Sequence, residues 1–549
     1  MKFKYITLSV ATALLMQCAS THLYVPPKPL PDDRRDIPEP AYQEFNLVYN
    51  VLDKQIINQV DQSFDFARQL RNVTGKPKQA FNVTAFDEVE NSSWFTNRNA
   101  TQRMSMEDFR RGPDTCHGPD TTGKWMITRA KGEGITPGFH IKNSNGDRYV
   151  IKFDPPGYSE LATGAEVVST KLFYAAGYNT PENYIVTFNQ DILVMGDDVK
   201  FTDNKGKKRP MNETDLEELL SRIERQPDGR IRALASKYVP GIPKGPYAYE
   251  GYRKDDPNDF VPHDYRRELR AIRVMAAWLN HTDAKSGNSF DSYVVDNGKH
   301  YIRHYLIDFG STLGSASHGP MEPQYGYENQ IDPHQICLNI LLLGLYVRPW
   351  EKQPGVKYPS IGLYESSMFD PFNFEFNIPI PAFENCTSRD GYWGAKLVMS
   401  FTDEQLEAAV AEGQYSDPEA AAYLVKILRE RRDKTGRYWF GRINPIDDFE
   451  LLKSGNTCRL TFHDLSVDTG LEQAEGTRYR YCVLKGGKDI IPQTVVETPV
   501  IDLEDVPVGE QIAVQIETAR NGSDNWGKWV QVYVNGEEDG PVLVGLERE

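Results

Sequence analysis

The sequence predicts an α+β protein in which a helical N-terminal extension precedes a two-lobed core, and a β-sandwich follows the core. Three patterns support this prediction. Short apolar segments separated by turn residues begin at Lys124, which indicates a sheet. Apolar residues recur at helical spacing over 263–280, immediately before a cluster of polar residues. Beyond Leu452 the pattern returns to short strands, which is typical of a separate β domain.

Length and composition indicate a globular protein. The chain has 549 residues, which is enough for two or three domains, and 39% of its residues are hydrophobic and 26% charged. Its formal net charge of −16 argues against a broad nucleic-acid-binding surface, because neutralising phosphates requires clustered Lys and Arg. We therefore expect no nucleic-acid partner.

The N-terminus has the features of an export signal. Two lysines precede an apolar run over residues 5–16, which is too short to cross a bilayer comfortably. Cys18 then follows in a pattern that resembles a bacterial lipoprotein box, although Gln17 replaces the small residue usual before that cysteine. We expect residues 1–20 to be a signal peptide. The protein would be periplasmic or, with a lipid on Cys18, a lipoprotein of the outer membrane or cell surface.

Residues 21–120 are expected to form a Pro-rich tether and a helical extension. Residues 21–42 are rich in Pro and charge, which favours an extended chain. Apolar residues then recur at helical spacing from Val48 to Leu70, and this stripe requires a partner surface.

Three short strands are predicted at 125–130, 139–143 and 148–153. The loop between the first two contains Gly132, Gly134 and Gly138, and glycine lets backbone N–H groups approach phosphate oxygens closely. The loop is not a strict Gly-x-Gly-x-x-Gly sequence, so on its own it is weak evidence for a phosphate site.

Lys152 lies near the end of the third predicted strand. A helix is expected over 159–176, closed by Gly177 as its C-cap. Glu166 lies in the middle of this helix and is the better candidate partner for Lys152. Glu160, at the start of the helix, is the alternative and could simply complement the helix dipole.

The polar cluster that follows residues 263–280 contains Asp283 and Asn288. Two strands joined by an Asn297-Gly298 turn are predicted next, and the second strand leads to Asp308 in an Asp-Phe-Gly sequence. Such a hairpin would deliver the carboxylate of Asp308 to a cleft. The alternative is a surface hairpin with ordinary turn carboxylates.

These motifs together resemble those of the atypical kinase-like superfamily, which includes HipA-like toxin kinases, spore-coat CotH-like kinases and secretory-pathway kinases. The resemblance covers about residues 124–348. It rests on Ile151-Lys152, Gly164-Ala165-Glu166, His281-Thr282-Asp283 with Asn288, and Asp308-Phe309-Gly310. It implies a kinase-like N-lobe with a hinge region at 121–260 and a kinase-like C-lobe at 261–452.

The resemblance also implies roles for the site residues. Asp283 would be the catalytic Asp, Lys152 would bind nucleotide phosphates and Glu166 would orient Lys152. Asn288 and Asp308 would hold Mg²⁺, which requires oxygen ligands. The loop with Gly132, Gly134 and Gly138 would cover the phosphates of ATP.

Two further segments are predicted beyond this core. The apolar stretch 336–347 predicts a helix that is too short to span a bilayer. Residues 453–549 predict an immunoglobulin- or fibronectin-like β-sandwich. Its expected strands are 458–463, 478–484, 493–500, 511–518 and 528–535.

The expected function is that of an exported atypical kinase that transfers a phosphoryl group from Mg-ATP to a protein or cell-envelope acceptor. Adenylyl transfer is one alternative. The other is a catalytically silent kinase-fold lipoprotein that acts in binding or as a scaffold, because a periplasm or cell exterior is poor in ATP. The expected partners are a nucleotide, the acceptor and, through a lipid anchor, a membrane.

Overall fold

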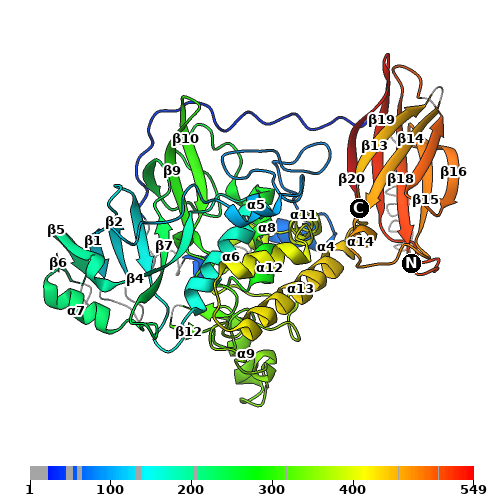
Figure 1. The fold of residues 1–549 in the computed structure, drawn as a ribbon. Helices are drawn as coiled ribbons and strands as arrows, with labels where there is room; N and C mark the ends of the chain where they lie inside the picture. The colour runs from blue at the N-terminus through cyan, green and yellow to red at the C-terminus, as the bar shows by residue number, and fades with distance from the viewer. Residues whose placement is uncertain are drawn as a thin grey trace, which may run out of the picture. The chain divides into compact units, whose positions relative to one another are not determined.

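The computed structural model describes residues 23–44, 53–57, 65–131, 138–202, 207–316, 318–454, 457–504 and 506–549. The predicted signal peptide, including Cys18, lies outside these residues. The chain divides into two compact units: Leu30–Val83 with Val89–Arg442, and Met1–Pro29 with Thr84–Glu88 and Ile443–Glu549. The mixture of helices and sheets predicted from the sequence is confirmed (Figure 1).

The larger unit contains a seven-stranded sheet in the order β4-β7-β3-β2-β1-β5-β6. Its strands are β1 (Trp125–Lys131), β2 (Gly138–Lys142), β3 (Arg148–Lys152), β4 (Asn183–Phe188), β5 (Leu193–Thr202), β6 (Lys208–Pro210) and β7 (Ile231–Lys237). The three strands predicted first form an antiparallel meander, and β5 pairs parallel with β1. Side chains alternate between the two faces, so Phe139, Ile141, Tyr149 and Ile151 are fully buried in one apolar core.

Helix α6 (Leu161–Ala176) follows β3 and is buried along almost its whole length. Gly177 closes it as predicted, because its N–H donates to the carbonyl groups of Phe173 and Tyr174. Gly177 has φ +128°, and a Cβ there would lie 2.3 Å from the ring of Phe95, so both the backbone and the packing require glycine.

The other helices of the larger unit are α4 (Phe66–Val73), α5 (Met106–Arg111), α7 (Glu213–Ser221), α8 (Arg267–Leu279), α9 (Pro333–Leu341), α10 (Pro381–Glu384), α11 (Ser388–Met399), α12 (Asp403–Glu412) and α13 (Pro418–Phe440). Single turns occur at η1 (Asp53–Ile57), η2 (Gln190–Ile192), η3 (His263–Tyr265), η4 (Ser286–Asn288) and η5 (Pro349–Lys352). Helix α8 packs against α11 and α13. Helix α9 ends earlier than the predicted helix 336–347, because the chain turns at Leu343 and Gly344, which both have positive φ.

A smaller sheet in this unit has the order β10-β9-β8. Its strands are β8 (Ile242–Gly245), β9 (Ser289–Asp296) and β10 (Lys299–Leu306), and a two-residue bridge of β11 (Ser315–Ala316) with β12 (Gly319–Pro320) lies further along the chain. Asn297 and Gly298 have φ +50° and +76°, the left-handed conformations that a tight hairpin turn needs. The predicted hairpin therefore forms with β9 and β10 in full antiparallel register.

Part of the segment predicted to be a tether lies on this smaller sheet. The N–H of Ile37 donates to the carbonyl of His300 at 2.9 Å, and the N–H of Gln43 donates to the carbonyl of Lys244 at 2.9 Å. The side chain of Ile37 is buried with Tyr293 and Ile302. An extended, Pro-containing segment is thus fixed by backbone pairing and one apolar anchor.

The smaller unit contains two antiparallel sheets, ordered β13-β14-β17 and β16-β15-β18-β19-β20. Its elements are β13 (Ile446–Ser454), β14 (Thr457–Asp464), α14 (Leu465–Asp468), β15 (Arg478–Lys485), β16 (Lys488–Val496), β17 (Val500–Glu504), β18 (Gln511–Ala519), β19 (Trp529–Glu537) and β20 (Gly540–Arg548). Buried residues from both sheets form one hydrophobic cluster. The boundary predicted at 452–453 falls inside β13, and the strand predicted at 493–500 is divided between β16 and β17.

Candidate functional site

A cavity of about 470 Å³ lies where β1–β3, α6 and the loop that follows α8 meet. Among the residues proposed from sequence, its lining includes Gly138, Lys152, Glu166, Asp283 and Asp308. The structure therefore brings together side chains that are far apart in the sequence. Two further proposed positions, Gly132 and Gly134, lie outside the described residues.

Lys152 lies between two carboxylates on one wall of this cavity. Its Nζ donates to Glu166 Oε1 at 2.7 Å and to Oε2 at 3.0 Å, and to Asp308 Oδ1 at 2.9 Å. The side chain of Glu166 is 3% exposed, that of Lys152 33% and that of Asp308 53%. The buried carboxylate thus holds the ammonium group from behind, and the exposed one faces the opening.

Burial and charge act in opposite directions on these groups. Burial favours the neutral amine of Lys152, but the carboxylates of Asp308 and Glu166 raise its pKa above the usual value. The Lys152 ammonium lowers the pKa of Asp308. Burial raises the pKa of Glu166, although Lys152 opposes this shift. At neutral pH Lys152 is therefore protonated and Asp308 ionised.

Asp154 fixes the position of Glu166 relative to Lys152. Its Oδ1 accepts the N–H groups of Ala162 at 2.8 Å and Thr163 at 2.9 Å, at the start of α6. These are two of the N–H groups that a helix leaves without internal partners. Asp154 was not selected from sequence, because its partners belong to the next element.

The structure also decides between the two candidate partners of Lys152. Glu160 Oε2 accepts the backbone N–H of Ser416 at 2.9 Å, whereas Glu166 contacts the lysine. Glu166 is the partner because it lies on the turn of α6 that faces the cavity.

Asp308 has a left-handed backbone, with φ +66°, which costs a non-glycine residue free energy. The next side chain secures this conformation. Phe309 is fully buried and stacks on Phe173 of α6 with ring centroids 4.9 Å apart. The N–H of Ile307 donates to the carbonyl of Asn288 at 3.0 Å, which ties the approach to Asp308 to the neighbouring loop.

Asp283 is held in that loop by two neighbours. Lys285 Nζ donates to Asp283 Oδ1 at 2.6 Å. Asn288 Nδ2 donates to the carbonyl oxygen of Asp283 at 2.8 Å and to its Oδ2 at 3.0 Å. Lys285 was not selected from sequence, although its position two residues after Asp283 indicated that the two side chains lie close together.

The oxygen atoms available here fit a magnesium ion. Among the described residues, no hydrogen-bond donor reaches Asn288 Oδ1 or Asp308 Oδ2. Both are hard oxygen ligands of the kind that Mg²⁺ prefers. Within the described part of the chain, no group of three or more His, Cys, Asp or Glu side chains could hold a metal ion. Mg²⁺ often takes only one or two protein carboxylates and completes its coordination with phosphate oxygens and water.

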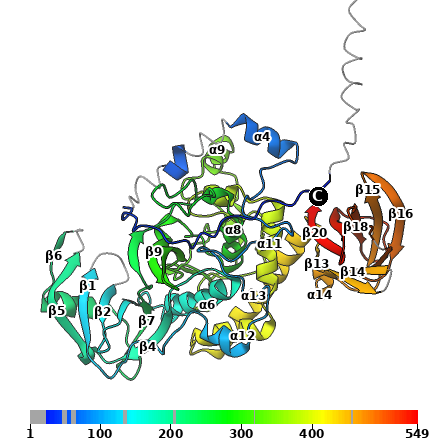
Figure 2. The ribbon, with the colours of Figure 1, turned by 90° about the horizontal axis from the view of Figure 1, so that it is seen from above.

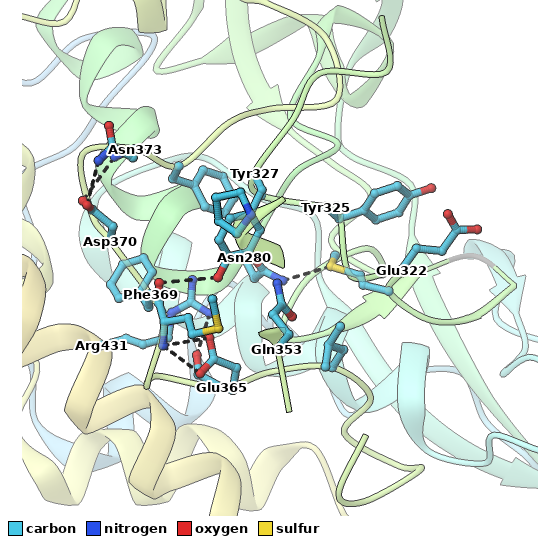
Figure 3. Close-up of a pocket in the computed structure, with 16 residues that line it drawn as sticks. Asn280, Glu322, Tyr325, Tyr327, Gln353, Glu365, Phe369, Asp370, Asn373 and Arg431 are labelled. Carbon is cyan, nitrogen blue, oxygen red and sulfur yellow. Dashed lines mark hydrogen bonds between the residues drawn. The ribbon is translucent and has the colours of Figure 1, made fainter. Parts of the chain in front are cut away.

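A second cavity, of about 390 Å³, is lined by Asn280, three residues before Asp283 (Figure 3). Asn280, the left-handed C-cap of α8, contributes to its lining together with Tyr325, Tyr327 and Phe369. Burial raises the pKa of Tyr325, and Glu322 and Asp283 add to this shift, so Tyr325 is within electrostatic range of Asp283.

Arg431 forms part of the buried wall of this second cavity. Its guanidinium group lies 3.9 Å from the ring centroid of Phe369 and donates to the carbonyl of Ala277 at 2.6 Å. Burial lowers its pKa. The cavity thus combines aromatic faces with polar edges beside the loop that carries Asp283, as expected of a site for a small polar group.

Comparison with known proteins shows only distant structural similarity. The chain matches no protein-family model and no curated protein. It is similar to the solved structure of the Helicobacter pylori proinflammatory kinase CtkA at 12% identity and a TM-score of 0.29, with 55% of this chain and 94% of that chain covered.

Two structures of the Golgi casein kinase are also similar to this chain. The one with Mn and ADP bound has 12% identity and a TM-score of 0.30, with 74% of this chain and 91% of that chain covered. The other has 11% identity and a TM-score of 0.27, with 75% and 95% covered. Values this low assign no activity, so the chemistry of the cavity rests on its own geometry.

Proposed function

We propose that the chain is a kinase-like phosphotransferase that moves a phosphoryl group from Mg-ATP to a hydroxyl group of a protein or cell-envelope acceptor. The observation that supports this most directly is the position of Lys152, 2.7 Å from Glu166 and 2.9 Å from Asp308, in a cavity that Asp283 also lines. A protonated amine, two potential metal-ligand oxygens and a separate carboxylate are the groups that phosphoryl transfer requires.

Each group has a role in this proposal. The Lys152 ammonium, held by the buried Glu166, would bind the nucleotide phosphates. Asp308 Oδ2 and Asn288 Oδ1 would hold Mg²⁺, which neutralises phosphate charge when it is bound. Gly138 begins β2 at the edge of the cavity, where its backbone can approach the nucleotide.

Asp283 would position the acceptor hydroxyl and take its proton. Lys285 lies 2.6 Å from this carboxylate and would place positive charge beside the group being transferred. Asn280, which leads into the same loop, lines the second cavity (Figure 3), so this cavity would receive the acceptor. Catalysis would then consist mainly of positioning and charge neutralisation.

The proposal includes the wider organisation of the chain. Residues 121–260 would form the N-lobe and hinge, residues 261–452 the C-lobe, and residues 453–549 an immunoglobulin- or fibronectin-like sandwich. The apolar run over residues 5–16 supports export, and Cys18 supports attachment to a membrane lipid.

Intact-mass spectrometry of the purified chain after incubation with Mg-ATP tests the proposal, with Asp283→Ala as the control. A phosphoryl increment that the variant loses supports the proposal, and an adenylyl increment supports the alternative chemistry. Calorimetry with Mg-ATP on the same sample tests the silent-scaffold alternative. If the chain shows no mass increment and also binds no nucleotide, the proposed function is wrong.

A further inference from the structure

An apolar projection, formed by residues 340–345, begins in the last turn of helix α9 in the larger unit. Ile340, Leu341, Leu343 and Leu345 are 69%, 75%, 88% and 84% exposed. Single exposed apolar side chains are ordinary on a protein surface, but a contiguous cluster of largely exposed apolar side chains indicates an interaction site.

The projection is a formed turn. The N–H of Gly344 donates to the carbonyl of Asn339 at 2.9 Å, and the N–H of Leu345 donates to that of Leu342 at 2.9 Å. A Cβ added at Gly344 would meet no atom within 4 Å, so the tip points into open space. The surface is therefore a protruding edge, and no groove encloses these leucines.

Helix α4 presents a second apolar stripe. Phe66, Leu70 and Val73 recur at helical spacing, which places them on one side of the helix, and they are 71%, 65% and 87% exposed. Figure 2 shows α4 and α9 along the same edge of the larger unit. Both apolar groups therefore belong to one edge of the larger unit in this view.

The charges around helix α4 are basic. Residues 65–78 contain Arg68, Arg71, Lys76 and Lys78 against the single acid Asp65, in a chain whose net charge is −16. At the projection the charges balance, because Arg348 is paired with Glu328 and Lys352 follows Glu351. Positive charge beside exposed aliphatic side chains is the pattern by which interfacial segments bind anionic lipids.

Aromatic residues stand at the base of the projection, where an interface with lipid headgroups would lie. The Trp350 indole N–H donates to Glu328 Oε1 at 2.6 Å, and Tyr346 is half-buried. Tyr and Trp are enriched at this depth of a bilayer because one end of each ring is apolar and the other polar.

We propose that α4 and the segment 336–347 together dock the larger unit on the surface of a bilayer that contains anionic lipids. None of the described helices is long and apolar enough to cross a membrane, so these segments would enter only its interfacial region. The contact is independent of the proposed phosphotransfer and of any lipid on Cys18.

A second copy of this chain is a less suitable occupant of the same surface. A two-fold interface uses the same surface of both copies, which must therefore be complementary to itself. Two separate convex projections also lack a complementary hollow, whereas a fluid bilayer adapts to both.

Site-specific photocrosslinking of the full chain, purified without lipid attachment, tests this inference. The crosslinking amino acid p-benzoylphenylalanine replaces Leu343 or Leu70, and the probe is a vesicle of phosphatidylethanolamine and phosphatidylglycerol. The matched control carries it at Val295, an equally apolar side chain of the larger unit that is 66% exposed on β9. We expect lipid adducts at positions 343 and 70 and none at position 295.

Two further substitutions test whether the leucines themselves enter the bilayer. With Leu341→Asp and Leu345→Asp also present, the lipid-adduct yield at position 343 should fall about tenfold, because each carboxylate resists leaving water. Val295→Asp should leave it unchanged, and thermal melting checks that each variant folds. A protein–protein adduct at position 343, or no lipid adduct there, would overturn the inference.

Discussion

The carboxylate of Asp154 accepts both the backbone N–H and the side-chain hydroxyl of Thr163, each at 2.9 Å. Asp154 closely follows Lys152, and Thr163 closely precedes Glu166. The Asp154 carboxylate therefore sets the distance between β3 and α6 at the point where Lys152 and Glu166 form their ion pair. The loop between the two elements therefore shapes the cavity, although Asp154 does not line it.

Asp154→Ala should weaken both the helix and the nucleotide site. Losing a helix cap costs about 0.5–2 kcal/mol, and the loosened Glu166 should reduce Mg-nucleotide affinity by about tenfold. Calorimetry and thermal melting measure the two effects. Asp417→Ala is the matched control, because Asp417 caps α13 through the N–H of Glu419 at 2.8 Å. It should lower stability similarly and leave nucleotide affinity unchanged; an equal loss of affinity would contradict the role given to Asp154.

Lys152→Met should abolish Mg-nucleotide binding, because it removes the ammonium group that lies 2.9 Å from Asp308. It also leaves the 3% exposed carboxylate of Glu166 without its partner, which should destabilise the fold by about 3–5 kcal/mol. The double variant Lys152→Met with Glu166→Gln should recover most of this stability without recovering binding. Thermal melting and calorimetry separate the two losses, and a double variant that binds nucleotide would refute the assignment.

Local patterns allowed much of the core to be predicted from sequence. The alternation at Phe139 and Ile141 predicted β2, and Asn297-Gly298 predicted the turn between β9 and β10. Both signals lie inside the element that they specify. The resemblance that rested on short motifs likewise selected Lys152, Glu166 and Asp308, which the fold brings into contact.

Features that depend on distant partners could not be predicted from sequence. Strand β5 extends to Thr202 because parallel pairing with β1 stabilises a polar stretch that has little strand propensity of its own. Helix α13 extends to Phe440 because Trp439 and Phe440, at its end, are buried. Lys285 carried a local signal, but only its 2.6 Å contact with Asp283 shows its relevance.

Asp283→Asn should separate binding from chemistry. The amide keeps the shape of the side chain and its neighbours but cannot take a proton, so phosphoryl transfer should fall by about 10²–10⁴-fold while Mg-nucleotide affinity stays within about twofold. Lys285→Met should reduce transfer without removing nucleotide binding, because Lys285 contacts Asp283 and not Asp308. Single-turnover transfer and calorimetry measure these effects. Transfer at the parent rate in Asp283→Asn would exclude this carboxylate as the base.

Gly391→Ala should destabilise the packing of α11 on α13. A Cβ at Gly391 would lie 2.1 Å from the ring of Trp439, which is buried. Overpacking of this kind costs about 1–3 kcal/mol, which exceeds the roughly 1 kcal/mol that alanine gains over glycine in a helix. Gly355→Ala is the control, because nothing lies within 4 Å of its added Cβ. Thermal melting should show a lower midpoint for Gly391→Ala and an unchanged one for the control.

Protonation of Glu166 should set the acidic pH at which the chain loses affinity for Mg-nucleotide. Burial raises the pKa of Glu166 above its ordinary 4.5, whereas Lys152 lowers that of Asp308 below its ordinary 3.8. As pH falls, Glu166 therefore takes up its proton first, and Lys152 loses the partner that orients it. The pKa of Lys152 itself is raised, so the ammonium persists on the alkaline side.

Mg-nucleotide affinity should therefore be flat through neutral pH and fall on acidification at a pH above 4.5, before Asp308 is protonated. Glu166→Gln removes the titrating group, so it should bind more weakly at neutral pH but lack this early acid limb. Calorimetry across the pH range, with protein stability followed in parallel, distinguishes this loss from unfolding. If the acid limb persists unchanged in Glu166→Gln, another group controls it and the orienting role of Glu166 is wrong.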